Sequence, residues 1–285
     1  MQTTDCLVQL PLSIVIPTLG GASLVETLKT LNAGPQVPSE ILVCIPDSHI
    51  SKLQEFDWNN VKVLSTIIKG QVCQRLEGFK RASQPYIMQL DDDIQILSSS
   101  INELLNQLIL LGEDAAVAPI YLDEATGESI HQYSTGWRAF FSNLTSTILI
   151  GAPWGLKRMG CITPAGTNYG VDINHMRSDL MEVDWVPGGC VLHHHSNLCM
   201  ESFFPFHGKA YCEDLIHSTL LRSKGVRLFV VKAASCKTEL AILPISRQEV
   251  KANMRARHYF NTFTGRPMLR FWIWCLITRL RRGIS

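Results

Sequence analysis

The stretch Tyr86 to Asp93 (YIMQLDDD) decides the fold, because an apolar run of strand length ends in three consecutive carboxylates. Like charges repel, so these acids need solvent, a cation or a metal ion beside them. A helical pattern follows, with capping-box spacing at Ser100 and Glu103. The acids therefore occupy a strand-to-helix loop. In open α/β sheets, ligands bind outside the carboxyl ends of the strands.

Short apolar runs alternate with helical patterns around this stretch, which predicts an α/β fold with a mainly parallel central sheet flanked by helices. We expect strands at 13–18, 40–45, 61–68, 86–90, 115–122 and 226–231, and helices at 23–32, 71–83 and 213–224. Between residues 123 and 182 the periodicity fades. Long irregular segments in compact domains are usually functional, so we expect a lid or a substrate-binding insertion there.

The composition is that of an ordinary globular protein and excludes disordered, collagen-like and coiled-coil chains. The chain has 285 residues, of which 46% are hydrophobic and 18% charged. Its nine cysteines include no CxxC pair, which favours a reducing compartment. Met1 to Leu12 lacks the basic and apolar regions of a signal peptide, and no stretch reaches the roughly 18 apolar residues of a membrane span. We therefore expect a cytoplasmic protein.

The charge is unevenly distributed. Residues 247–285 contain nine Lys or Arg and one acid, a net +8, so the preceding 246 residues carry −7 of the overall +1. Within this basic tail, residues 268–280 (MLRFWIWCLITRL) place aromatic side chains between arginines. That pattern suits the headgroup boundary of an anionic membrane, although a helix packed on the domain would read similarly. We expect a domain at 1–246, an amphipathic tail at 247–285, and no nucleic-acid partner.

Two further motifs have both a functional and a structural interpretation. Glu213-Asp214 opens the helix predicted at 213–224, so it supplies either a general base or simple charge at a helix N-terminus. Residues 185–189 (WVPGG) form either a turn that lets the backbone approach a ligand or an ordinary Pro-Gly turn. Consecutive His193, His194 and His195 would point to alternate faces of an extended segment, so we do not expect them to bind one ion together.

The order of these motifs resembles the nucleotide-sugar glycosyltransferases of family 2, whose fold is called GT-A. The residues that carry the resemblance are IVIPT (14–18), EILVCIPDS (40–48), LDDDI (90–94), WVPGG (185–189) and YCEDLIHSTLLRSKG (211–225). It covers residues 12–232 and implies a single GT-A, Rossmann-like domain at 1–246. The insertion at 123–182 would then bind the acceptor.

The resemblance also implies roles for individual residues. Asp91 and Asp93 would hold Mn²⁺ or Mg²⁺ on the donor diphosphate, and Asp214 would be the catalytic base with Glu213 beside it. The implied donor-binding residues are Pro17, Thr18, Asp47, Arg75, Asp91, Asp92, Gly188 and Gly189. Two positions depart from the family pattern: residues 45–47 (IPD) replace a pair of acids near the base, and residues 233–236 (AASC) stand where many relatives place a metal-binding His.

The implied reaction is inverting, metal-dependent transfer of one sugar from a nucleoside-diphosphate sugar, expected to be a UDP-sugar, to a hydroxyl of a glycan or lipid-linked acceptor. We expect a role in cell-surface polysaccharide synthesis, with the tail holding the enzyme at the inner face of the membrane. Two alternatives stay open. A sugar nucleotidyltransferase would need a glycine-rich basic loop, which Gly20-Gly21 followed only by Lys29 supports poorly. A non-catalytic carbohydrate-binding protein could use the same scaffold.

Overall fold

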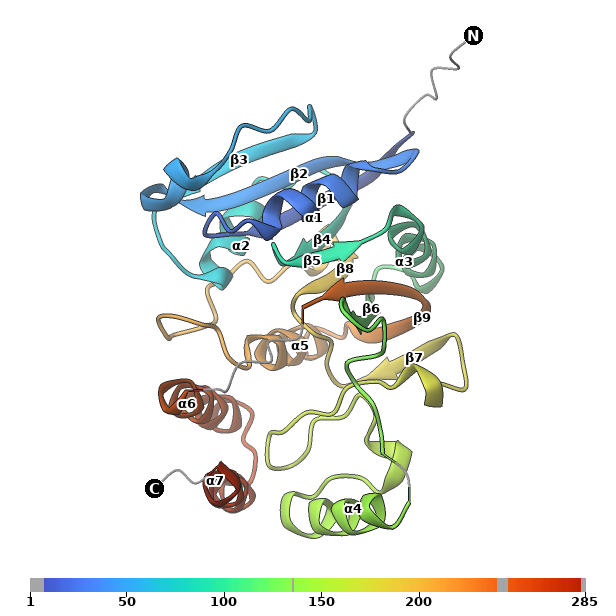
Figure 1. Ribbon diagram of the computed structural model, residues 1–285, viewed down its shortest axis with the longest axis vertical. Helices are drawn as coiled ribbons and strands as arrows, with labels where there is room; N and C mark the ends of the chain where they lie inside the picture. Colours follow the sequence, from blue (N-terminus) through green and yellow to red (C-terminus); the bar gives the residue numbers. More distant parts are fainter. Residues whose placement is uncertain (1–7, 135, 240–245, 283–285) are drawn as a thin grey trace.

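The computed structural model describes residues 8–134, 136–239 and 246–282, and it places one mixed sheet between layers of helices (Figure 1). The strands run in the order β3-β2-β1-β4-β8-β6-β9-β5, and β7 pairs with β9. Their bounds are β1 Val8–Pro17, β2 Gln36–Pro46, β3 Val61–Thr66, β4 Tyr86–Leu90, β5 Ile94–Ile96, β6 Ala115–Asp123, β7 Leu180–Val183, β8 Cys190–His194 and β9 Arg227–Thr238. The longer helices are α1 Ser23–Asn32, α2 Gln71–Phe79, α3 Ser98–Leu111, α4 Trp137–Ile150, α5 Glu213–Ser223, α6 Arg247–Phe263 and α7 Met268–Arg282.

The strands that carry the predicted site are parallel. β3, β2, β1 and β4 pair in parallel, as do β6 and β9, whereas β8 lies antiparallel between β4 and β6. The predicted α/β fold with a mostly parallel sheet is therefore confirmed. Because β1 and β4 are parallel neighbours, their carboxyl ends meet at one edge of the sheet. Thr18 and the acids at 91–93 follow those two ends.

Alternation of side chains along the strands explains the two helical layers. On β1, Ile14 and Ile16 face a cluster that includes Leu24 and Leu28 of α1, whereas Val15 faces the cluster of Phe79 at the end of α2. α3 covers the same face as α1. The sheet is therefore buried on both faces, which agrees with the near-continuous apolar runs in the sequence.

The structure corrects several local predictions. α3 begins at Ser98 after Leu97, which makes no side-chain cap, so the predicted capping box is wrong. Ser100 instead lies inside the helix, where its Oγ accepts a hydrogen bond from the backbone N–H of Ser235 at 3.1 Å. Helix α2 ends at Phe79 rather than at residue 83, and the segment 123–182 contains a helix, α4, that the periodicity did not reveal. β9 continues to Thr238, so residues 233–236 lie inside a strand.

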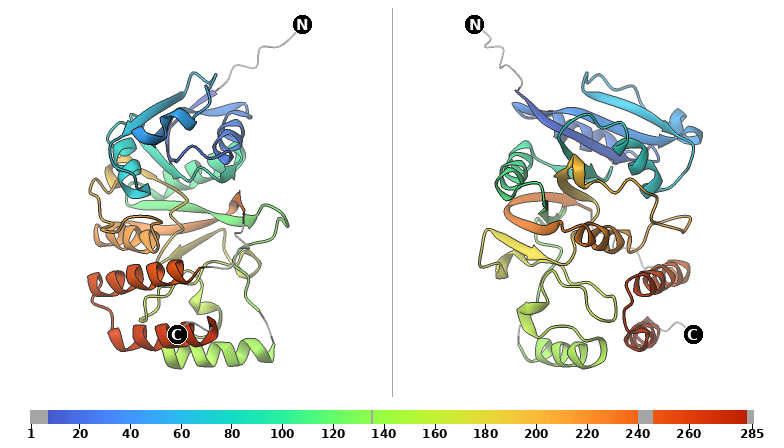
Figure 2. Two further views of the ribbon diagram at one scale, coloured as in Figure 1. Left: turned by 60° about the vertical axis from the view of Figure 1, so that its left-hand side comes forward. Right: turned by 180° about the vertical axis from the view of Figure 1, so that it is seen from behind.

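The basic tail forms two helices that pack on the rest of the chain. Ser246 and Glu249 form a capping box at the start of α6, and Phe260 is buried in a cluster with Trp185 and Leu215. α7 lies beside α4 at the end of the molecule away from the N-terminus (Figure 2). The division at residue 246 thus coincides with the start of α6, although it stays a prediction. No helix in the described ranges has the length and apolar character needed to cross a membrane.

Candidate active site

A buried arginine joins the two acidic motifs. Arg75, on α2, donates from Nη2 to Asp91 Oδ1 at 2.5 Å and from Nη1 to Glu213 Oε1 at 2.8 Å. Its side chain is only 4% exposed, and that of Glu213 only 7%. Burial alone would lower the pKa of Arg75, but Glu213 and Asp91 raise it above its ordinary value, so the guanidinium stays charged. The acids at the end of β4 and at the start of α5 therefore share one cation.

Gly188 and Gly189 allow this approach. A Cβ on Gly188 would lie 2.3 Å from Glu213 Oε1, and a Cβ on Gly189 would lie 3.0 Å from Asp91 Oδ2. The backbone is also paired here, because the carbonyl of Gly189 accepts from the amide of Asp91 at 2.8 Å and that of Gly188 accepts from Gln89 Nε2 at 2.7 Å. Because neither glycine has a side chain, Glu213 and Asp91 can lie directly against this turn.

A cavity of about 800 Å³ opens at this edge of the sheet, and we call it the donor cavity after the donor site predicted from the sequence. Several predicted donor-binding residues line it: Pro17, Thr18, Asp91 and Asp92, together with Asp93. Its other walls come from the loop after β1, the start of α2 and the segment 207–210. The volume lies within the usual range of ligand sites.

The three consecutive acids have different partners. Asp91 Oδ1 accepts two hydrogen bonds, one from Gln71 Nε2 at 2.7 Å and one from Arg75. Asp92 accepts a short hydrogen bond from Thr18 Oγ1. Asp93 is exposed to solvent and makes no side-chain hydrogen bond to another residue of the described chain. Although part of its side chain reaches solvent, the surrounding protein removes water from the rest of the carboxyl, and this partial desolvation, followed by the charges of Asp91 and Asp92, raises the pKa of Asp93.

The carboxylate oxygens at this site are suitable ligands for a divalent cation. Mg²⁺ and Mn²⁺ prefer oxygen ligands, and a cation that also binds a diphosphate needs only one or two carboxylates from the protein. Asp93 and the second oxygen of Asp91 are the groups that would hold it. No group of three or more His, Cys, Asp or Glu in the described ranges has the arrangement of a metal site, so a third protein ligand is not identified. A cation would also relieve the repulsion that raises the pKa of Asp93.

Asp214 is half-buried at the first turn of α5. Its Oδ1 accepts from the amide of Leu215 at 2.9 Å. Burial and the neighbouring charge of Glu213 raise the pKa of Asp214 to about 7, and the positive charge of Arg257 opposes them. A carboxyl that titrates near neutrality can accept a proton at the working pH. Asp214 does not line the donor cavity. The lining residue that precedes it in the chain is Ala210.

Other predicted residues lie apart from this network. Asp47 is exposed at the start of a short 3-10 helix (Asp47–Lys52) and does not line the donor cavity, so its contact with the base stays a prediction. Along β8, His193 packs against Phe79 and His194 against Tyr86. The neighbouring rings therefore diverge, as the strand geometry predicts.

Six polar residues that line the donor cavity were not predicted from the sequence: Ser23, Lys69, Gln71, Gln74, His207 and Lys209. Of these, Gln71 holds Asp91. Lys209 belongs to a segment with no regular secondary structure, and its charge lowers the pKa of Asp93. Gln71 and Gln74 had a sequence signal, because both lie on the helix predicted at 71–83 and Gln71 precedes Arg75 by one helical turn.

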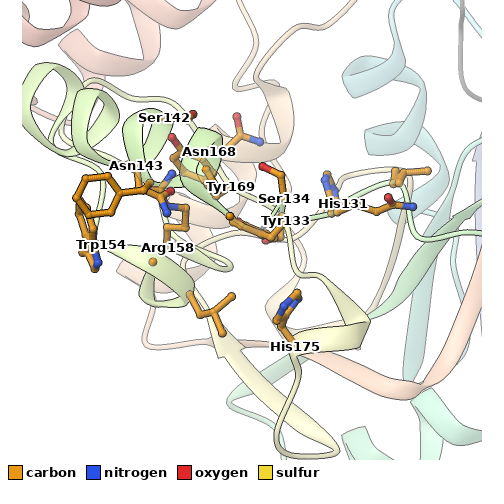
Figure 3. Close-up of a pocket in the computed structure, with 18 residues that line it drawn as sticks. His131, Tyr133, Ser134, Ser142, Asn143, Trp154, Arg158, Asn168, Tyr169 and His175 are labelled. Carbon is orange, nitrogen blue, oxygen red and sulfur yellow. The ribbon is translucent and has the colours of Figure 1, made fainter.

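A second cavity, of about 650 Å³, lies in the insertion at 123–182, and we call it the acceptor-side cavity (Figure 3). Figure 3 shows aromatic and polar side chains around it, including Trp154, Tyr133, Tyr169 and His131. Arg158 also lines it; this residue is buried and stacks on Tyr169, with 4.9 Å between guanidinium carbon and ring centroid. Its Nη2 has no hydrogen-bond partner in the described chain. An anionic oxygen is the natural partner for such a group.

Trp185 connects this cavity with the acidic network. Its Nε1 donates to the carbonyl of Tyr169 at 2.9 Å, and its ring meets His131 edge to face with centroids 6.3 Å apart. Gly188 follows three residues later and lies against Glu213. The WVPGG segment therefore contacts both the acceptor-side cavity and the site around Arg75.

Comparisons with known proteins identify the family and the fold. A family model described as "Glycosyl transferase family 2" matches residues 13–163. Among solved structures, GalNAc-T7 with UDP, GalNAc and Mn²⁺ shares the fold at TM-score 0.58 and 15% identity, covering 90% of this chain and 48% of that one. S. aureus TarS 1–349 aligns at TM-score 0.49 and 14% identity, with coverages of 87% and 64%. The chain thus spans about half the length of the GalNAc-T7 chain. No curated protein sequence matches it.

Proposed function

This chain belongs to glycosyl transferase family 2, and from that premise we propose that it transfers one sugar from a nucleoside-diphosphate sugar to an acceptor hydroxyl with inversion at the anomeric carbon. The observation that carries the proposal is that one buried arginine, Arg75, pairs both with Glu213 and with Asp91, which lines the donor cavity. The family favours this activity over the nucleotidyltransferase and non-catalytic alternatives.

The donor would lie in the donor cavity, with its diphosphate near Asp93. A divalent cation held by Asp93 and Asp91 would neutralise negative charge on the departing diphosphate. Lys69 and Lys209, which line the same cavity, would add positive charge there. A UDP-sugar is the expected donor, and the UDP and Mn²⁺ in the GalNAc-T7 structure support testing UDP with Mn²⁺ first.

Asp214 would act as the general base. Its carboxylate would take the proton of the acceptor hydroxyl while the oxygen attacks the anomeric carbon. The bond from that carbon to the diphosphate oxygen breaks on the opposite face, and the nucleoside diphosphate leaves with the electron pair. A pKa of about 7 suits this role, because the group is ionised in a useful fraction of molecules and still accepts a proton effectively.

The acceptor would bind in the acceptor-side cavity. Trp154 and Tyr169 offer flat apolar faces for sugar rings, and the buried guanidinium of Arg158 offers a charged donor to a carboxylate or phosphate. These features favour a glycan or lipid-linked acceptor that carries negative charge, as in cell-surface polysaccharide synthesis. The basic helix α7 would hold the enzyme at the inner face of an anionic membrane.

Product analysis tests the proposed reaction. Incubation with a panel of nucleotide sugars, Mn²⁺ and lipid-linked or free glycan acceptors should release nucleoside diphosphate. NMR should show the new glycosidic bond with the opposite anomeric configuration to the donor. Release of pyrophosphate would instead identify a nucleotidyltransferase, and a retained configuration would exclude the role proposed for Asp214.

A further inference from the structure

Helix α4 exposes a continuous apolar stripe. Trp137, Phe141, Leu144 and Ile148 are between 37% and 70% exposed. Their spacing of four, three and four residues places them on one face of the helix. The other side of α4 faces the protein: Ala139 is buried, and Phe140 meets Trp154 at the acceptor-side cavity with ring centroids 5.4 Å apart.

Helix α7 has the same division. Its inner face packs on the domain through Phe271 and Cys275, which are both buried. On the outer face, Leu269, Trp272, Leu276 and Leu280 are between 55% and 73% exposed, at helical spacing. From the sequence, this helix could either pack on the domain or lie at a membrane surface. Its inner face is packed on the domain, whereas its outer face is apolar and exposed.

The two helices are neighbours at one end of the molecule (Figures 1 and 2). Trp274 of α7 packs against the cluster of Ile150, at the end of α4, and Ala165. A side chain on Gly151 would collide with the guanidinium of Arg270. α4 and α7 therefore form one unit, which we call the two-helix end.

The sequences of the two helices carry only positive charge. Neither helix contains an acidic residue, whereas α4 has an arginine at position 138 and α7 has arginines at 270, 279, 281 and 282. Large apolar side chains with tryptophan, flanked by arginines, suit the headgroup region of an anionic bilayer. A surface for an ordinary protein partner would not require the exclusion of acids.

We propose that α4 and α7 together form a membrane-binding surface that lies in the plane of an anionic bilayer. The inference extends the contact proposed for α7 to a second helix, and it does not depend on the proposed sugar transfer. The helices have 14 and 15 residues, which is too short to span a bilayer but sufficient to lie on one. Because α4 also forms a wall of the acceptor-side cavity, this orientation brings that cavity to the membrane surface.

Vesicle flotation of the full chain tests the surface one helix at a time. The α4 variant is Phe141→Ser with Ile148→Ser, and the α7 variant is Leu276→Ser with Leu280→Ser; none of these residues lines a described cavity. The matched control is Ile109→Ser with Leu110→Ser on α3, where both side chains are more than half exposed. The vesicles contain phosphatidylcholine, with or without phosphatidylglycerol.

We expect the wild type to bind phosphatidylglycerol vesicles and to release them at high salt, since the arginines contribute. The α4 and α7 variants should each bind about tenfold more weakly or worse, whereas the control should bind like the wild type. Circular dichroism checks folding; if the α4 pair fails to fold, the single variant Ile148→Ser replaces it.

Three results would overturn the inference. Full binding by the α4 variant would remove α4 from the surface. Equal weakening in the α3 control would show that any exposed apolar residue contributes. The third result is a protein that binds no vesicles but is a dimer in solution, and whose dimer the double serine substitutions dissociate. It would show that a second copy of the chain, not a membrane, covers this surface. Retained stabilisation by UDP and Mn²⁺ in each variant separates these results from a failure of the proposed donor site.

Discussion

The two cavities of this protein, which we propose bind the donor and the acceptor, are built from different kinds of interaction. Around the donor cavity, three of the four acids have partners in the described chain: Arg75 pairs with Asp91 and Glu213, and Thr18 with Asp92, whereas Asp93 makes no side-chain hydrogen bond to another residue. The acceptor-side cavity is built from loops, aromatic rings and α4, and its buried cation, Arg158, has an unpaired Nη2. Most acids of the first side are therefore already held by protein groups, whereas we propose that the unpaired Nη2 of Arg158 on the second side is left for an acceptor.

The comparison predicts different responses to substitution. Changes on the donor side should reduce stability and catalysis together, because the same ion pairs hold the fold and position the site. Changes on the acceptor side should affect mainly the KM for the acceptor, because cavity-wall side chains contribute little to the core.

The largest effect is expected at Arg75. Arg75→Met would leave two carboxylates at a buried site without their cation, which should lower the free energy of unfolding by about 3–5 kcal/mol and abolish transfer. Urea denaturation measures the loss. The control Arg81→Met removes a pair with Glu77 at 3.4 Å whose side chains are 54% and 35% exposed, so it should cost about 0–1 kcal/mol. Equal losses in both variants would contradict the special position of Arg75.

Asp214→Asn should slow the chemical step without disturbing donor binding. Asparagine keeps the shape of the side chain but cannot act as a base, so kcat should fall about 10²- to 10⁴-fold. Steady-state kinetics at saturating donor gives the value. Asp179→Asn, at an exposed acid outside both cavities, provides the matched control and should behave as wild type. A wild-type kcat in Asp214→Asn would remove this residue from the mechanism.

The pH dependence should report the same residue. With a pKa of about 7, Asp214 must lose its proton to act as a base, so kcat/KM should rise about tenfold per pH unit below pH 7 and level off above it. Folding raises the pKa of Asp214 from 3.8 to about 7, so the folded chain binds a proton more tightly than the unfolded chain. This contribution to stability is fully present below about pH 4 and is lost as the pH rises through about 7. The non-ionising Asp214→Asn should accordingly melt at a higher temperature than wild type at pH 8, and not at pH 4.

Sequence reasoning predicted the strands around the donor cavity well, because they are buried on both faces and read as uninterrupted apolar runs. The same reasoning predicted that the acids at 91–93 and at 213–214 belong to one site, which stays a prediction for Asp93 and Asp214 because Asp214 does not line the donor cavity. The sequence also does not show that Arg75 joins Asp91 to Glu213, since that contact depends on the packing of α2. α4 was missed for the opposite reason. Its apolar residues face outward as well as inward, so the stretch 137–150 has no clear polar face.

The smallest effect is expected at the rim of the acceptor-side cavity. Trp154→Leu removes an aromatic face, worth about 0.5–1.5 kcal/mol, so the KM for the acceptor should rise up to about tenfold while that for the donor is unchanged. Trp272→Leu, an exposed tryptophan on α7 outside the cavity, is the control in detergent-solubilised assays. A larger change in donor KM than in acceptor KM would show that the two sides are not separate.

The most direct test of the account is the melting temperature of the wild type and Asp93→Asn with UDP and Mn²⁺, added singly and together. A ligand that binds only the native state raises its stability in proportion to RT ln(1 + [L]/Kd). The account predicts that UDP and Mn²⁺ together raise the wild-type melting temperature well beyond the sum of their separate effects, and that Asp93→Asn loses this excess. An equal excess in Asp93→Asn, or no stabilisation by any nucleoside diphosphate, would contradict a metal-assisted donor site at the end of β4.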